Sequence, residues 1–412
     1  MRQAGLRAGR EQTQGVGRLA RSLRRARVVV KRRRKTFWAL LAAGIMVFCA
    51  AAWPFTRAHL QAVAVLDEVG GQPVPWVVRQ VTVPVTTEDF SFPAESAAGV
   101  QMVRARLYLP QGRPNAPAMV VFHGVHHLGI DEPRLMGFAA AMASCGIRVL
   151  TPELPDIKDY HVSADSVKTI GESAKWYAGQ TGRPVGVMGL SFSGGLALVA
   201  ASDPLYQPDF KFVFAVGSQD SMDRVTQYYR TGEDVRPDGT KEVLPAHEYG
   251  PLVLEYEYVQ DFVPRQDVGP VRAVLRAHLY EDRMAEAEAS LGLNEAQKRE
   301  TLELMDTTSP ATRAKIAAVI ARHANELAGL SPRGRLETLR TPVYLLHGEA
   351  DNIIPSAETL WMASELPREG LKAMLVSPVL SHLDLDGAQP GAMDEWRLAH
   401  FFALILEAAE RK

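Results

Sequence analysis

The chain contains very little cysteine, with only Cys49 and Cys145 among its 412 residues. Cys145 is the single cysteine after the N-terminal apolar segment, which excludes an intramolecular disulfide there, and its apolar helical surroundings predict a buried small side chain. Internal repeats and low-complexity segments are missing beyond a basic N-terminal stretch, so nothing indicates a propeller or solenoid. At 47% hydrophobic and 23% charged residues, the composition is typical of a globular protein with a sizeable core.

Net charge is almost absent, at −1, but residues 1–35 carry +12 and the remainder carries −13. A basic segment alone is typical of nucleic-acid binding. This one is followed directly by an apolar run, Phe37–Phe55, and the pair predicts membrane targeting and no nucleic-acid partner. A helix of that length spans roughly 28 Å, about the thickness of the bilayer hydrocarbon core.

The apolar run has two possible fates. It is either a membrane anchor over residues 36–55 or a cleaved signal segment, since Ala50-Ala51-Ala52 satisfies a small-x-small cleavage rule. In both cases the basic residues before the apolar run predict that the chain after the run lies outside the cytoplasm, in the periplasm or extracellular space. The anchor predicts a membrane-attached protein, and cleavage predicts a secreted one.

From residue 85 onward, strand and helix patterns alternate, which predicts a mostly parallel sheet with helices on both faces. This alternation stops near Ser218, where the sequence becomes mostly helical and charged, and it resumes near residue 337. We therefore divide the chain into six segments: a basic segment 1–35, an anchor or signal segment 36–55, a linker 56–84, two core parts 85–218 and 337–412, and between them a helical lid insertion 219–336.

The segment PVGVMGLSFSGG places Ser191 between a strand and a helix. A hydroxyl at such a turn is exposed at the sheet edge, and the turn needs small residues two positions before and after the nucleophile. Gly189 meets this requirement, but the second position holds Ser193 where glycine is usual. Ser193 therefore stays an alternative nucleophile.

A serine hydroxyl is a weak nucleophile, so it requires a base, and the base requires an orienting carboxylate. Asp351 follows one predicted buried strand and His382 follows the next. All three side chains therefore come from strand ends that meet at one sheet edge, in the order Ser, Asp, His. Asp220 and Asp223, which follow an earlier strand, are the competing acids.

Three histidines, His123, His126 and His127, cluster in HGVHHLGID. Their H-x-x-H spacing lacks the glutamate of an H-E-x-x-H zinc site, so we interpret His123 as a residue that shapes its loop. We expect neither a metal nor a cofactor.

The segments VVFHG, GLSFSGG, LLHGEADNIIP and SHLDLD resemble the signature blocks of the α/β-hydrolase superfamily, over residues 85–218 and 337–412. The resemblance implies an α/β-hydrolase fold with Ser191 as nucleophile, His382 as general base and Asp351 as the residue that orients His382. It also implies an oxyanion hole formed by the backbone N–H groups of Phe192 and Val125.

We therefore expect a serine hydrolase that cleaves a carboxylic ester, on a small-molecule or lipid-like substrate, through an acyl-enzyme and without a cofactor. Two alternatives are a prolyl-oligopeptidase-like peptidase and a catalytically silent protein of the same fold that binds a partner or a lipid. We expect four tyrosines of the insertion either to line an acyl pocket or to belong to the hydrophobic core. They are Tyr228, Tyr229, Tyr256 and Tyr258.

Overall fold

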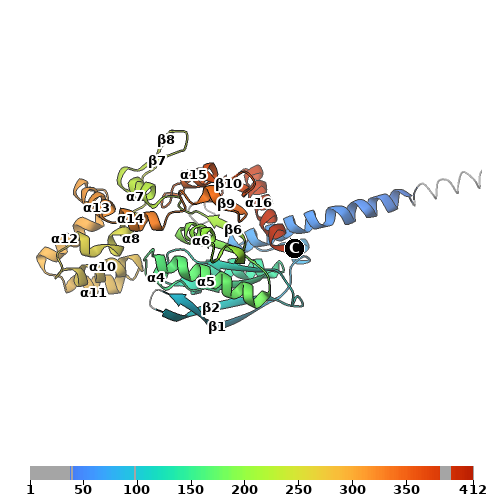
Figure 1. Ribbon diagram of the computed structural model, residues 1–412, viewed down its shortest axis with the longest axis horizontal. Coiled ribbons are helices and arrows are strands. Elements are labelled where there is room, and N and C mark those ends of the chain that lie inside the picture. The colour runs from blue at the N-terminus through green and yellow to red at the C-terminus, as the bar shows by residue number, and fades with distance from the viewer. Residues whose placement is uncertain (1–37, 39, 97–98, 381–390, 412) are drawn as a thin grey trace, which may run out of the picture. The chain divides into compact units, whose positions relative to one another are not determined.

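The computed structural model describes residues 38, 40–96, 99–380 and 391–411. It divides into two compact units, Met1–Arg57 and Ala58–Lys412. The second unit contains the sheet, its covering helices and the insertion (Figure 1).

The second unit is built on an eight-stranded sheet with the order β1-β2-β4-β3-β5-β6-β9-β10. β2 pairs antiparallel with β1 and β4, and every other pair is parallel. This confirms the predicted mostly parallel sheet, and the structure adds an antiparallel hairpin, β1 with β2, at one edge. The strands are β1 Val85–Ser96, β2 Gly99–Pro110, β3 Ala118–Phe122, β4 Arg148–Pro152, β5 Val185–Leu190, β6 Phe210–Val216, β9 Val343–Gly348 and β10 Leu371–Ser377.

Helices cover both faces of this sheet, and strand β3 shows how. Its Val120 and Phe122 belong to one hydrophobic cluster with α5 and α6, whereas Met119 and Val121 belong to a second cluster with α3 and α16. A strand buried on both faces requires such a continuous apolar run. The helices outside the insertion are α2 Trp76–Arg79, α3 Pro133–Ser144, α4 Pro155–Lys158, α5 Ala164–Thr181, α6 Phe192–Ser202, α15 Ala357–Glu365 and α16 Ala392–Glu410.

The insertion lies between β6 and β9 and has a hydrophobic core of its own, to which α8, α10, α12 and α13 contribute (Figure 1). Tyr160 of the main fold also belongs to that core, and its hydroxyl donates to the Leu279 carbonyl at 2.7 Å. The elements are α7 Met222–Thr231, a hairpin of β7 Glu233–Val235 and β8 Lys241–Val243, α8 Tyr249–Glu257, α9 Val259–Phe262, α10 Val268–Leu279, α11 Arg283–Leu291, α12 Glu295–Met305, α13 Pro310–Arg322 and α14 Ala324–Gly329.

A single long helix, Leu40–Val69, begins in the apolar run and continues past Phe55. By length and composition it is able to cross a membrane, and its apolar window has a mean hydropathy of 1.5 with none of it buried. The predicted apolar N-terminal helix is therefore present, and it is longer than the run that predicted it.

The last turns of this helix, from Ala58 onward, pack into the second unit. Ala58, Ala62 and Val65 are buried in the cluster that also contains α3 and α16. The buried Gln61 side chain donates to the carbonyls of Val81 and Cys145, at 3.0 and 2.8 Å. Residues 58–69 fall in the segment that the sequence assigns to a linker, but they are helical, and the buried side chains among them hold them against the second unit.

Candidate active site

Ser191 occupies a strained turn between the end of β5 and the start of α6. Its backbone has φ 54° and ψ −134°, a left-handed conformation that a residue with a Cβ atom rarely adopts. The Ser191 N–H donates to the Val216 carbonyl of β6 at 2.8 Å, and the residue is only 3% exposed. Such strain persists only where the surrounding structure imposes it, and it is typical of functional positions.

The turn closes because two glycines allow the backbone segments to meet. A Cβ atom on Gly189 would lie 2.4 Å from the Gly194 nitrogen, and one on Gly194 would lie 2.7 Å from the Gly189 oxygen. Both distances are far too short for real atoms, so any larger residue at either position would force the turn apart. The glycine that allows the two backbone segments to approach is therefore Gly194, one residue after the position at which the sequence motif usually has glycine.

Ser193 has a different role from Ser191 in the described structure. Its hydroxyl is fully buried and donates to the His123 carbonyl at 2.6 Å. This hydrogen bond connects the serine turn to the loop that follows β3. A hydroxyl held in this way favours a positioning role for Ser193 and Ser191 as the reactive group.

The loop after β3 is shaped by His123, whose two ring nitrogens are both engaged. Nδ1 lies 2.8 Å from the Gly124 carbonyl, and Nε2 accepts a hydrogen bond from the Leu154 N–H at 3.0 Å. Burial lowers the pKa of His123 to about 4, so the ring is neutral near pH 7. A neutral ring with both nitrogens occupied fits the predicted loop-shaping role.

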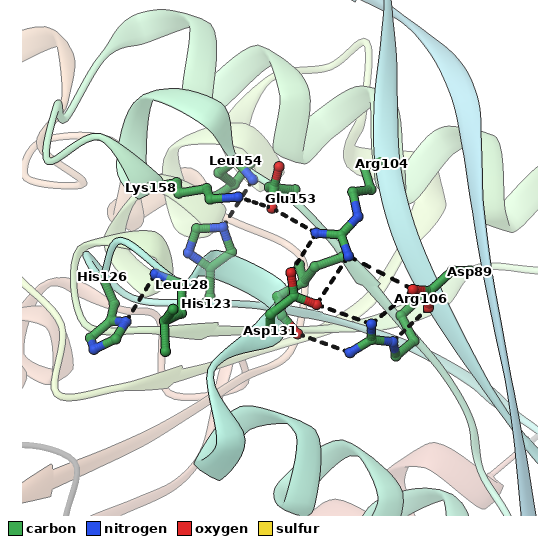
Figure 2. Close-up of polar contacts among 11 residues, drawn as sticks. Asp89, Arg104, Arg106, His123, His126, Leu128, Asp131, Glu153, Leu154 and Lys158 are labelled. Atoms are coloured by element: carbon green, nitrogen blue, oxygen red, sulfur yellow. Dashed lines mark hydrogen bonds and ion pairs between the residues drawn. The ribbon is translucent and has the colours of Figure 1, made fainter.

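The same loop is held against strand β2 by ion pairs (Figure 2). Two nitrogens of Arg104 contact the Asp131 carboxylate at 2.7 and 3.0 Å, and Arg106 contacts it at 3.0 Å. Arg106 also forms a two-pronged pair with Asp89 at 2.6 and 2.8 Å. The hydrogen bond from Arg104 lowers the pKa of Asp131, which keeps the carboxylate ionised and the loop tied to the sheet.

Asp351 lies after β9 and is completely buried. Its Oδ1 accepts hydrogen bonds from the N–H groups of Ile353 and Ile354, both at 2.9 Å. Its Oδ2 lies 3.4 Å from Nε2 of His347, whose closer contact is the Ile354 carbonyl at 2.8 Å. The two backbone donors fix the orientation of the carboxylate, as an orienting acid requires.

The competing acids are placed differently. Asp220 is buried, but it pairs with Arg224, and Arg224 also binds Glu358 at 2.8 Å. Burial, and then the neighbouring Glu358, raise the pKa of Asp220 to about 7. Asp223 is exposed on α7. Asp220 therefore belongs to a separate network, which favours Asp351 as the acid.

A cavity of about 330 Å³ contains Ser191. Gly124 and Val125 line it from the loop after β3, and Ile353, which donates to Asp351, lines it from the other side. The structure thus brings Ser191, the Val125 segment and a neighbour of Asp351 to one cavity. His382 lies outside the described residues.

Further polar residues that the sequence did not indicate line the same cavity. Glu132 and Arg134 come from the start of α3, and His247, Tyr249 and Glu281 come from the insertion. The Tyr249 hydroxyl donates to the Val125 carbonyl at 2.8 Å, so the insertion contacts the loop directly. Glu281 has a positive φ of 56°, a second strained position at this cavity. None of these residues follows a pattern in the sequence, because each comes from a loop or a helix end.

The tyrosines considered for an acyl pocket are core residues. Tyr228, Tyr229, Tyr256 and Tyr258 are at most 4% exposed and belong to hydrophobic clusters. A cavity beside Tyr229 and Tyr258 has a volume of only about 30 Å³, which is room for a water or two. None of the four lines the cavity of Ser191.

His126 and His127 stack on each other, with ring centroids 4.6 Å apart, and His127 also stacks on Tyr280. His126 lines the cavity, and its Nδ1 accepts a hydrogen bond from the Leu128 N–H at 3.2 Å. Burial lowers the pKa of His126, so a neutral ring faces the cavity near pH 7. Within the described ranges, no three His, Cys, Asp or Glu side chains are grouped so as to hold a metal ion.

No protein-family model matches the chain, and no curated protein matches it at a significant level. Among solved structures it is similar to an esterase of Pyrobaculum calidifontis, with 14% identity over 86% of this chain and 88% of that chain and a TM-score of 0.42. An acylaminoacyl peptidase of Pyrococcus horikoshii is 15% identical over 79% of this chain and 42% of that chain, with a TM-score of 0.40. A membrane phospholipase A described as a bacterial virulence factor is 13% identical over 92% and 100%, with a TM-score of 0.41. The chemistry of the site therefore rests on its own residues.

We predict that Ser191→Gly stabilises the protein by about 1 kcal/mol, because glycine relieves about 1–3 kcal/mol of backbone strain and loses about 0.5–1 kcal/mol to chain entropy. Ser193→Gly is the matched control. It should lower the free energy of unfolding by about 1–2 kcal/mol, since it removes the hydrogen bond to His123. Urea unfolding measures both. Equal destabilisation by the two changes would show that the turn at Ser191 is not strained.

Proposed function

We propose that the chain is a serine hydrolase of the α/β-hydrolase type that cleaves a carboxylic ester through an acyl-enzyme; the strand order of its sheet and the helices on both faces support this proposal. One observation carries the proposal: a strained serine at the end of a central strand faces a cavity that it shares with the Gly124-Val125 backbone. A surface loop that merely joined a strand to a helix would have no reason to hold a serine in that conformation.

In the proposed reaction, the Ser191 hydroxyl oxygen attacks the acyl carbon while His382 accepts the hydroxyl proton. Asp351 keeps the imidazole oriented and stabilises its charged form. The tetrahedral intermediate collapses when His382 gives the proton to the leaving alcohol, and the acyl group stays on Ser191. Water, deprotonated by the same histidine, then attacks the acyl carbon, releases the carboxylic acid and restores the Ser191 hydroxyl.

We assign the oxyanion hole to the backbone N–H groups of Phe192 and Val125. Phe192 is the first residue of α6, where helix N–H groups have no acceptor within the helix. The loop that carries Val125 is held by Ser193 on one side and by Tyr249 on the other. Donors fixed in advance stabilise the transition state by a few kcal/mol each, which requires a loop that does not rearrange during the reaction.

We also propose that the helix Leu40–Val69 attaches the enzyme to a membrane and that the catalytic unit lies outside the cytoplasm. The basic residues before Phe37 support the orientation, because such residues stay on the cytoplasmic side. The buried turns from Ala58 onward are retained in either case, since cleavage near Trp53 would leave them on the mature chain. Both fates of the apolar run are therefore compatible with the fold.

Fluorophosphonate labelling tests the proposed nucleophile and acid, because only an activated serine reacts. We predict that Ser191→Ala abolishes labelling and reduces hydrolysis of a p-nitrophenyl ester by about a thousandfold or more. Asp351→Asn should also suppress labelling, whereas Asp220→Asn should still label. If Asp220→Asn loses labelling and Asp351→Asn keeps it, the orienting acid is Asp220 of the insertion and not Asp351. If Ser191→Ala still labels, the nucleophile is another residue. A wild-type protein that never labels would favour the silent alternative.

The orientation is tested with a reporter that is active only in the cytoplasm, fused after Lys412. We predict that the fusion stays silent, while the same reporter fused before Met1 is active. A strong signal from the C-terminal fusion would contradict the topology. The N-terminal sequence of the mature protein separates the two fates, since a start near Trp53 means cleavage.

A further inference from the structure

A second cavity, of about 100 Å³, lies beside the cavity of Ser191. Four of the described residues line both of them: Glu132, Arg134, Leu135 and Leu190. Leu190 directly precedes Ser191 in the chain. The second cavity is therefore adjacent to the cavity of Ser191, and the shared side chains form the wall between the two cavities.

The two compartments differ in chemistry. Beyond the shared residues, the second cavity is lined by apolar side chains, among them Phe138, Met188, Val216 and Phe402. Among the described lining residues, the polar groups are confined to the shared wall, where Arg134 pairs with Glu132 at 2.8 Å. The cavity of Ser191, in contrast, contains histidines, carboxylates and a tyrosine hydroxyl. An ester with one apolar arm and one polar arm matches this division.

Leu66 and Val69, in the last turn of the helix Leu40–Val69, form another part of the apolar lining. Both are partly buried and pack against the cluster that contains α3 and α16. The helix that is long and apolar enough to cross a membrane thus ends with two side chains in the wall of this compartment. Neither the composition of the apolar run nor the fold of the catalytic unit requires that.

We propose that this apolar compartment holds the acyl chain of the substrate and that Leu66 and Val69 set the length of chain that fits. The proposal rests on the proposed hydrolase function and extends it, because it makes the N-terminal helix part of the substrate site. The acyl carbon would lie at Ser191, and the chain would run past Leu190 towards the helix. The alcohol part, which is polar, would remain in the larger cavity.

The volume limits the chain length. An apolar cavity of about 150 Å³ accommodates a benzene molecule, so a compartment of two thirds that size has room for about four methylene groups. Hexanoyl esters should therefore be better substrates than acetyl esters. One buried methylene group changes the preference of such a pocket by roughly tenfold or more.

The test uses the full-length protein in lipid nanodiscs, with p-nitrophenyl hexanoate and p-nitrophenyl acetate. Val69→Trp fills the compartment, so kcat/KM for hexanoate should fall by about tenfold or more while that for acetate changes by less than about threefold. Val63→Trp is the matched control, because Val63 is a half-buried valine on the same helix that does not line the cavity. It should leave the ratio of the two rates unchanged. An unchanged ratio in Val69→Trp would overturn the proposal.

A second measurement separates this proposal from the hydrolase function. Saturation-transfer NMR detects hexanoic acid bound to Ser191→Ala protein, which has no nucleophile to react. We expect binding that disappears when Val69→Trp is added. If hexanoic acid binds but the wild type hydrolyses neither ester, the proposed hydrolase function is wrong and the apolar binding site stands. If the wild type hydrolyses the acetate ester but hexanoic acid does not bind, the proposed acyl compartment is wrong and the hydrolase function stands. Val69→Ala enlarges the cavity and should therefore shift the preference to longer esters.

Discussion

The left-handed backbone of Ser191 is the constraint on which the rest of the site depends. A conformation that costs about 1–3 kcal/mol persists only because β5, β6 and α6 fix the chain on both sides of it. Gly189 and Gly194 allow the segments to approach closely enough. This conformation places Ser191 in the wall of a cavity, directly before the helix that follows.

The groups around this turn are held by elements far apart in the sequence. The Ser193 hydroxyl and the Tyr249 hydroxyl fix the loop of Val125 from the main fold and from the insertion. Arg104 and Arg106 of β2 hold the same loop through Asp131 (Figure 2). The insertion is thus more than a cover, because it contributes a hydrogen bond that positions the proposed oxyanion hole.

The sheet was predictable from the sequence because buried parallel strands such as AMVVF and VYLLHG leave continuous apolar runs between helices. The positions of Ser191 and Asp351 at the ends of central strands were predictable because each follows such a run. The packing of Gln61 and Leu66 was not predictable, since a helix end after a membrane-length apolar run has the same sequence character as a linker. Tyr249 and Glu281 were not predictable either, because they reach the cavity from helix ends whose position depends on the tertiary fold.

The central claim is that Ser191 attacks an acyl group whose oxygen is stabilised by the backbone amides of Phe192 and Val125. A crystal structure of the protein inhibited by an alkyl fluorophosphonate tests it most directly. We predict a covalent bond from phosphorus to the Ser191 hydroxyl oxygen, with the phosphoryl oxygen within hydrogen-bond distance of both amide nitrogens. An adduct on Ser193 or another residue, or a phosphoryl oxygen that faces neither amide, would contradict the account.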